Sequence, residues 1–292
     1  MFDYMTRTVV AGIDGSDYST KAALWAANEA ERRGLPLRLL HTYLSLGGSV
    51  PSTVMVPEEY FDAPRRLAHG IATRTAGAVI HQFPGLDVHS TLHSGAPAPA
   101  LIAASEHADL TVVGTRGKHR STLGSVAVKV AEHATGPVVV VPEHSTVDSS
   151  AGVLVGTDGS DESEPALRFA FEFAAGRAVP LTVVHSWDEA PLDDLQRATL
   201  LPVNRAVIDE EHATLLRDQV APWAEKFPEV TVHELVGRGR PDAVLLHEAQ
   251  RLQPSLIVIG SRGRGAFRGL LLGSTSRRVI VHAEHPVAVI RN

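Results

Sequence analysis

Short apolar runs alternate with longer amphipathic segments along the whole chain. The first run, residues 8–14, is rich in β-branched residues, which is typical of a strand that is buried on both faces. A helical pattern follows and continues to Arg33, with alanines and Trp25 forming its apolar stripe. Ser16 and Asp17 are suited to cap the start of this helix, and Gly34 is suited to end it. The chain is therefore predicted to begin with a buried strand and a covering helix.

The same alternation continues through the first half of the chain. Further strands are predicted at 37–42, 87–93, 110–113 and 137–141, helices at 58–82, 98–107 and 123–134, and an irregular loop at 45–57. Such alternation requires right-handed crossovers and a parallel sheet with helices on both faces. Ligands of these sheets bind at the carboxyl ends of the strands, where the winding direction reverses. A strand order of 3-2-1-4-5 would place strands 1 and 4 side by side at that point, and the sequence is compatible with it.

The second half of the chain repeats the first. Residues 8–16 recur at 152–160, and residues 110–117 recur at 256–263. The strands of the second copy are predicted near 152–158, 180–186, 230–236, 256–260 and 286–290. Two tandem copies of one α/β domain are expected, at 1–143 and 152–292, joined by the polar stretch from Glu143 to Ala151.

Composition narrows the class of protein. The chain has 292 residues, of which 44% are hydrophobic and 21% charged, as in a globular protein of two domains. A net charge of −6 gives no electrostatic reason to expect nucleic acid as a partner. No apolar run is long enough to span a membrane, the N-terminus does not resemble a signal peptide, and there is no cysteine for thiolate chemistry or disulfides. A cytoplasmic location is expected.

A glycine-rich segment follows the predicted strand at 256–259. Gly260-Ser261-Arg262-Gly263 is separated by nine residues from Gly273-Ser274-Thr275-Ser276, and a helical pattern runs from Leu270 to His282. Glycines allow close approach of the backbone and positive φ angles, and a helix N-terminus attracts anions. Arg262, Arg264 and Arg268 indicate a polyanionic ligand, with hydroxyl groups from residues 274–276. The alternative is a glycine-rich surface turn before a capped helix.

One aspartate ends the first strand of each copy: Asp14 in the first copy and Asp158 in the second. At the switch point, the place where the winding direction of the sheet reverses, each carboxylate would contact the base or ribose of a nucleotide, or a bridging metal ion. The alternative is an aspartate that accepts hydrogen bonds from N–H groups in its own turn.

Histidines are frequent, but their spacing favours no metal site. The chain has 15 histidines, and His89 and His93 lie four residues apart on a predicted strand rather than a helix. His41 and His185 end the second strand of each copy, followed by Thr42 and Ser186. These strand ends could place backbone groups against a purine edge, or the histidines could simply be satisfied within the sheet. No serine-hydrolase elbow, P-loop or dinucleotide fingerprint occurs.

These features resemble the universal stress protein family in its tandem two-domain form. The pattern Gly-x2-Gly-x9-Gly-(Ser/Thr) of its ATP-binding subgroup is matched by Gly260, Gly263, Gly273 and Ser274. The first-strand aspartates, the second strands ending in Leu-His or Val-His, and the final strands with Pro-Val-x-Val agree with it. The resemblance implies an adenine nucleotide alpha hydrolase-like fold that binds ATP, often with Mg²⁺. It also implies pairing of domains through their last strands, within the chain and again in a homodimer.

The resemblance extends to candidate nucleotide contacts in both copies. They are Gly12, Asp14, Thr42, Gly114, Arg116, Gly117, Gly124 and Ser125 in the first copy, and Gly156, Asp158, Ser186, Gly260, Ser261, Arg262, Gly263, Arg264, Gly265, Gly273, Ser274, Thr275 and Ser276 in the second. The first copy departs from the pattern, because only six residues separate Gly117 from Gly124 and because Val126-Ala127 replace Thr275-Ser276. A weaker first site is expected.

The sequence therefore favours an ATP-binding stress-response regulator over an efficient enzyme. No residue is evident as a base that activates water, although the arginines near the loop could support slow hydrolysis. A slow ATPase or another adenine-nucleotide-using enzyme on the same scaffold is the main alternative, and a nucleotide-free interaction module is the third. The protein partner, the inducing stress and the oligomeric state are left open.

Overall fold

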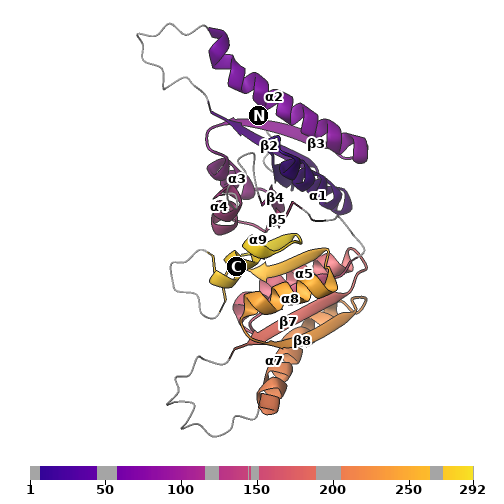
Figure 1. Cartoon of the computed structure of the whole chain (residues 1–292). Coiled ribbons are helices and arrows are strands. Elements are labelled where there is room, and N and C mark those ends of the chain that lie inside the picture. Colours follow the sequence, from indigo (N-terminus) through magenta and orange to yellow (C-terminus); the bar gives the residue numbers. More distant parts are fainter. Residues whose placement is uncertain are drawn as a thin grey trace, which may run out of the picture. The chain divides into compact units, whose positions relative to one another are not determined.

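The computed structural model describes residues 7–44, 58–115, 125–143, 145, 151–188, 205–263 and 272–291 (Figure 1). The chain divides into two compact units, Met1–Ser145 and Thr146–Asn292. The loop expected at 45–57 and most of the expected linker lie outside the described residues.

Unit 1 is an α/β unit whose described strands are all parallel. Its strands are β1 (Val9–Gly12), β2 (Leu37–Tyr43), β3 (Val88–Ser94), β4 (Leu110–Gly114) and β5 (Val138–Val141), and its helices are α1 (Asp17–Arg33), α2 (Glu58–Gln82), α3 (Pro97–Ser105) and α4 (Ser125–His133). The strand order is β3-β2-β1-β4-β5, the order expected for a doubly wound sheet. Helices α1 and α2 pack on one face of the sheet, and α3 and α4 on the other.

Helix α1 shows how the sequence sets the element boundaries. The side chain of Ser16, the N-cap residue, accepts a hydrogen bond from the backbone N–H of Ser19. Gly34 ends the helix in the left-handed conformation at φ 63°, which glycine adopts without a steric cost. Between these ends, the alanines of the predicted stripe and Trp25 are buried. The predicted caps are therefore confirmed.

Unit 2 repeats this arrangement. Its strands are β6 (Val153–Thr157), β7 (Leu181–Trp187), β8 (Val232–Arg238), β9 (Leu256–Gly260) and β10 (Val287–Ile290). Its helices are α5 (Glu164–Ala175), α7 (Arg205–Lys226), α8 (Pro241–Leu252) and α9 (Ser274–His282), and a short 3₁₀ turn, Asp161–Ser163, precedes α5. The strand order is β8-β7-β6-β9-β10. Helices α5 and α7 pack on one face of this sheet, and α8 on the other.

One predicted boundary in unit 2 is wrong. The helical pattern from Leu270 predicts an earlier start than Ser274, where α9 begins. Gly273 has an extended backbone (φ −68°, ψ 156°), and its N–H donates to the carbonyl of Ser261 at 2.7 Å. This residue closes the glycine loop and therefore cannot belong to the helix, while residues 270 and 271 lie outside the described part of the chain.

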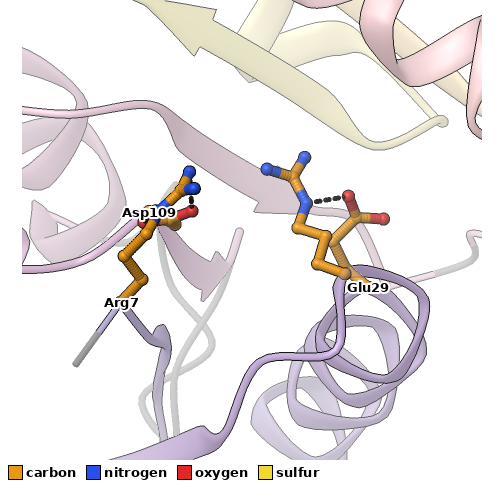
Figure 2. Close-up of polar contacts among 4 residues, drawn as sticks. Arg7, Glu29 and Asp109 are labelled. Carbon is orange, nitrogen blue, oxygen red and sulfur yellow. Dashed lines mark hydrogen bonds and ion pairs between the residues drawn. The ribbon is translucent and has the colours of Figure 1, made fainter.

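An arginine that follows a buried position has a different partner in each unit. In unit 1, the side chain of Glu29 is only 2% exposed and accepts a hydrogen bond from Arg33 (Figure 2). The corresponding residues of unit 2 are Phe173 on α5 and Arg177 in the turn after it, and the guanidinium carbon of Arg177 lies 3.7 Å from the centre of the Phe173 ring. A buried ion pair in one copy is thus replaced by a cation–π contact in the other.

A second ion pair in unit 1 joins a residue two positions before β1 to the residue before β4. Arg7 donates from Nε to Oδ1 of Asp109 at 2.8 Å, and Figure 2 shows both side chains.

Within the described parts of the chain, no helix is both long and apolar enough to cross a membrane.

Candidate functional site

The strand order of unit 2 brings two candidate loops together. Strand β6 pairs with β7 on one side and with β9 on the other, so the winding reverses between β6 and β9. Asp158 follows β6 directly, and Ser261 to Gly263 follow β9. A Cβ atom built on Gly263 would lie 2.6 Å from Oδ2 of Asp158. The carboxylate and the glycine loop are therefore in direct contact at the switch point.

The Asp158 carboxylate has a different neighbour at each oxygen. Oδ1 accepts hydrogen bonds from the backbone N–H of Ser160 at 3.0 Å and from its hydroxyl at 2.5 Å. In unit 1, Oδ1 of Asp14 accepts the same two bonds from Ser16. One oxygen thus serves the turn, as the capping interpretation predicts, while Oδ2 of Asp158 lies against the glycine loop.

Three hydrogen bonds close the glycine loop on itself and onto the sheet. The Ser261 N–H donates to the carbonyl of Ile290, the Gly273 N–H to the carbonyl of Ser261, and the Ser276 hydroxyl to the carbonyl of Gly260, each at 2.7 Å. Ser276 is buried at the start of α9, and because its hydroxyl bonds Gly260 at the end of β9, it joins the two ends of the loop. Sequence reasoning placed this hydroxyl on a phosphate, but in the structure it is engaged with the backbone.

The loop glycines provide space rather than an unusual backbone. None of Gly260, Gly263 and Gly273 has a positive φ, so of the two properties expected of glycine, close approach rather than positive φ is used at these positions. Positive φ angles occur at Gly15 and Gly159, which lie in the turns at residues 14–16 and 158–160; each turn is called the aspartate turn of its unit. What the loop requires at Gly263 is the absence of a side chain beside Asp158.

The N-terminus of α9 lies at the end of this loop. Ser274 is exposed and Thr275 half-buried, and both belong to the first turn, whose N–H groups have no partner within the helix. Arg262 is exposed on the same loop. Burial lowers the pKa of the Arg291 guanidinium, and the positive charge of Arg262 lowers it further. Two arginines therefore add positive charge near the loop.

Unit 1 forms a simpler version of this arrangement. The N–H of Thr115 donates to the carbonyl of Val141 at 3.0 Å, as Ser261 does in unit 2. Gly114 ends β4, and exposed Ser125 begins α4. Buried Ala127 stands where unit 2 has Ser276 and has no hydroxyl to close the loop. The candidates Arg116, Gly117 and Gly124 lie outside the described residues, as do Arg264, Gly265 and Arg268 in unit 2.

Two further candidate glycines have a packing role. A Cβ atom on Gly12 would lie 2.9 Å from Cδ1 of Leu101, and one on Gly156 would lie 2.8 Å from Cδ1 of Leu245. The missing side chains let α3 and α8 pack closely on the sheet. Thr42 and Ser186, the candidates on the second strands, are half-buried near the ends of β2 and β7.

The two strand-end histidines are bonded within the sheet. Nδ1 of His41 lies 2.6 Å from the carbonyl oxygen of Ile13, and Nδ1 of His185 lies 3.1 Å from that of Thr157. His185 is only 3% exposed. The structure therefore agrees with the interpretation in which the histidine side chains are satisfied by the sheet.

Sequence reasoning missed a group of polar residues around α7. Gln219 bonds the turn after β6, and His212 bonds His185. Asp209 accepts hydrogen bonds from Trp187 and Arg238, and the salt bridge with Arg238 lowers the pKa of Asp209. A signal was present for one of them: Gln219 is a polar residue within the stripe of α7 that buries Leu216 and Val220.

Within the described residues, no three His, Cys, Asp or Glu side chains are grouped so that they could hold a metal ion. At this site a cation would therefore need ligands from a bound nucleotide in addition to Asp158.

Comparison with known proteins agrees with the fold and the repeat. The model of the universal stress protein family matches residues 5–142 and again residues 152–291. A universal stress protein of Mycolicibacterium smegmatis is 35% identical over 292 residues, covering 97% of this chain and 96% of the relative. One of Mycobacterium tuberculosis is 32% identical over 309 residues, covering 97% and 94%. The chain therefore belongs to the universal stress protein family.

A solved structure supports the fold over the full length. The crystal structure of a universal stress protein from Archaeoglobus fulgidus superposes with a TM-score of 0.68 at 21% identity, covering 99% of both chains. The tandem α/β architecture expected from the sequence is thus confirmed.

Proposed function

We propose that this protein is an ATP-binding, nucleotide-dependent stress-response regulator of the cytoplasm whose competent site lies in unit 2. The observation that carries the proposal is the contact between Asp158 and Gly263 at the switch point between β6 and β9. In doubly wound sheets this is where ligands bind, and it is where the family pattern of glycines lies in this sequence. The position of these residues at the switch point supports a nucleotide site there.

The phosphates would lie along the glycine loop and the first turn of α9. The N–H groups of this turn and the hydroxyls of Ser274 and Thr275 are suited to bind phosphate oxygens, because a helix N-terminus attracts anions. Arg262 adds an exposed positive charge at the edge of the loop, where it could neutralise a terminal phosphate. Ser276 acts indirectly, since it holds the loop closed.

The Asp158 carboxylate is suited to the ribose hydroxyls or to a Mg²⁺ ion held by the phosphates. An ionised carboxylate only accepts hydrogen bonds, which suits hydroxyl groups, and its oxygens are ligands that Mg²⁺ prefers. A bound Mg²⁺ would neutralise phosphate charge. In unit 1 the shortened loop and Ala127 remove donors and the closing hydrogen bond, so that site is proposed to be weaker.

The proposal is tested by counting the nucleotide that the protein carries. The chain is purified without added nucleotide and denatured, and the released nucleotides are identified by mass and quantified per chain. The same preparation, freed of nucleotide, is titrated with ATP by calorimetry, with and without Mg²⁺. One tight site per chain is expected. Two equal tight sites would contradict the proposed asymmetry, and neither copurified nucleotide nor binding would refute the function.

A further inference from the structure

The aspartate turn of unit 2 is held by a side chain from α7. Gln219 accepts a hydrogen bond at Oε1 from the hydroxyl of Thr157 at 2.6 Å. Its Nε2 donates to the carbonyl of Ser160 at 3.1 Å and to the hydroxyl of Ser163 at 2.9 Å. Thr157 and Ser160 flank Asp158 and Gly159, so both sides of the turn are bonded to one amide group. An amide has both donors and an acceptor, which is what this cluster requires.

The same hydroxyl of Thr157 also orders the inside of the turn. It accepts the backbone N–H of Gly159 at 3.1 Å and lies 2.8 Å from the hydroxyl of Ser163. Thr157 and Ser163 are buried, at 7% and 5% exposure. A buried polar group that loses its partner is costly, so the arrangement resists displacement.

A second tether joins α7 to the backbone of Thr157. The Thr157 carbonyl can only accept, so Nδ1 of His185 carries the proton of their 3.1 Å contact. In neutral His185, Nε2 is then an acceptor, and Nδ1 of His212 on α7 donates to it at 2.9 Å. Helix α7 is therefore bonded to the side chain of Thr157 directly and to its carbonyl through His185.

Among the residues that the structure describes, unit 1 has neither tether. The residue aligned with Gln219 is Thr75, whose hydroxyl donates to the carbonyl of Ile71 within its own helix. The residue aligned with His212 is Ala68. Helix α2 instead places the apolar side chain of Ile71 against Gly15 of its aspartate turn. The polar connection to the second helix is thus a property of unit 2, the unit with the full glycine pattern.

We propose that Gln219 is a positioning residue of the nucleotide site in unit 2: it fixes the turn of Asp158 so that the carboxylate faces the glycine loop. This role rests on the proposed function and extends it, because it makes α7 part of the binding site without contact to the ligand. It also means that nucleotide occupancy and the position of α7 are linked, as any coupling between two sites is reciprocal.

The test compares two substitutions of Gln219 with a matched control. Gln219→Leu has a similar size but no hydrogen-bonding groups, and we expect ATP affinity about tenfold lower by calorimetry. Thr75→Val, at the aligned position of unit 1, is the control, and we expect its affinity to be unchanged. Circular dichroism and unfolding midpoints show whether each variant is folded at the temperature of the titration.

Gln219→Glu makes ATP binding depend on pH if Gln219 positions the turn, whereas a purely structural role predicts no such pH dependence. The ionised carboxylate keeps the acceptor for Thr157 but faces the Ser160 carbonyl with a second acceptor, so it repels the turn. Protonation restores a donor. The ratio of its dissociation constant to that of the unsubstituted protein should therefore fall toward one as the pH is lowered through the ordinary pKa of a glutamate side chain, about 4.3. This variant also serves as the test if Gln219→Leu does not fold.

The double variant Gln219→Leu/Asp158→Asn shows whether Gln219 acts through Asp158. If it does, the double variant binds ATP as weakly as Asp158→Asn alone, because the positioned group is already lost. Full additivity, or an unchanged affinity of Gln219→Leu, would overturn the positioning role while leaving the proposed function intact. An unsubstituted protein that binds no nucleotide would refute the function and this role together.

Discussion

Alanine at position 263 is the sharpest test of the contact between the glycine loop and the aspartate turn. A Cβ atom there would lie 2.6 Å from Oδ2 of Asp158, whereas ordinary contacts begin near 3.4 Å, so the atoms must separate by roughly 0.8 Å. The carboxylate resists this movement, because its other oxygen accepts two hydrogen bonds from Ser160. The backbone itself tolerates alanine, since Gly263 does not have a positive φ.

The magnitude follows from what the displaced carboxylate loses. One hydrogen bond to a charged group contributes about 1.5–3 kcal/mol, which corresponds to a loss of roughly 10- to 150-fold in affinity. Calorimetric titration of Gly263→Ala with ATP should therefore give a dissociation constant at least about tenfold higher than that of the unsubstituted protein. The unfolding midpoint should change little, because the clash lies in a surface loop and not in the core.

Gly77→Ala on α2 is the matched control. No heavy atom lies within 4 Å of a Cβ at this position, so the added methyl group meets nothing. Alanine in a helix interior is more favourable than glycine by up to about 1 kcal/mol, so this variant should be slightly more stable and should bind ATP normally. If Gly263→Ala bound ATP within twofold of the unsubstituted protein, ATP binding would not depend on the contact between Gly263 and Asp158, and the proposed role of this contact would be wrong.

Three other predictions follow from single contacts. Ser276→Ala leaves the Gly260 carbonyl without its hydroxyl donor, and we expect about 1–3 kcal/mol lower stability of unit 2 in urea denaturation together with weaker ATP binding; unchanged values for both would contradict the loop-closing role. Gly156→Ala would place a Cβ 2.8 Å from Leu245, and we expect about 1–3 kcal/mol of destabilisation, seen as a lower melting temperature. Burial lowers the pKa of His285, so the unfolded chain binds more protons and stability should decrease as the pH falls below about 6.5. His285→Gln should make the difference between urea midpoints at about pH 7.5 and pH 5.5 smaller, and an unchanged difference would exclude this histidine as its source.

Most of the fold could be predicted from the sequence, because its local signals agree with one another. Buried parallel strands are apolar throughout, and helices such as α1 carry both an apolar stripe and recognisable caps, so their positions were predicted to within a few residues. The repeat allowed each predicted element of one copy to be checked against the corresponding segment of the other copy. The start of α9 was the exception, since the apolar residues before Gly273 continue the helical period in the sequence although Gly273 itself closes the glycine loop.

The site could be predicted only in part. The glycine spacing and the aspartates are local patterns, and the doubly wound order places their loops next to each other. The contacts of Gln219 and His212 depend on where α7 packs and on which of its side chains face the turn, and no local pattern determines these. The role of Ser276 was also out of reach, because a hydroxyl near a glycine loop can bond a ligand or the backbone, and only the geometry distinguishes the two.

The ion pair on α1 has a consequence for how the two halves of the chain can exchange sequence. Glu29 is buried beside Arg33, while the corresponding positions of unit 2 hold Phe173 and Arg177. Recombination between the repeats that moved α1 into unit 2, or α5 into unit 1, would place a buried carboxylate in an environment that evolved around a phenyl ring, or the reverse. Because Arg33 belongs to α1 and would move with Glu29, the ion pair itself would persist; the cost would come from the mismatch in size and polarity with the new surroundings, about 1–3 kcal/mol for a poorly fitting buried side chain. Exchanging the first helices between the two copies is therefore expected to destabilise either unit, although the copies share one fold.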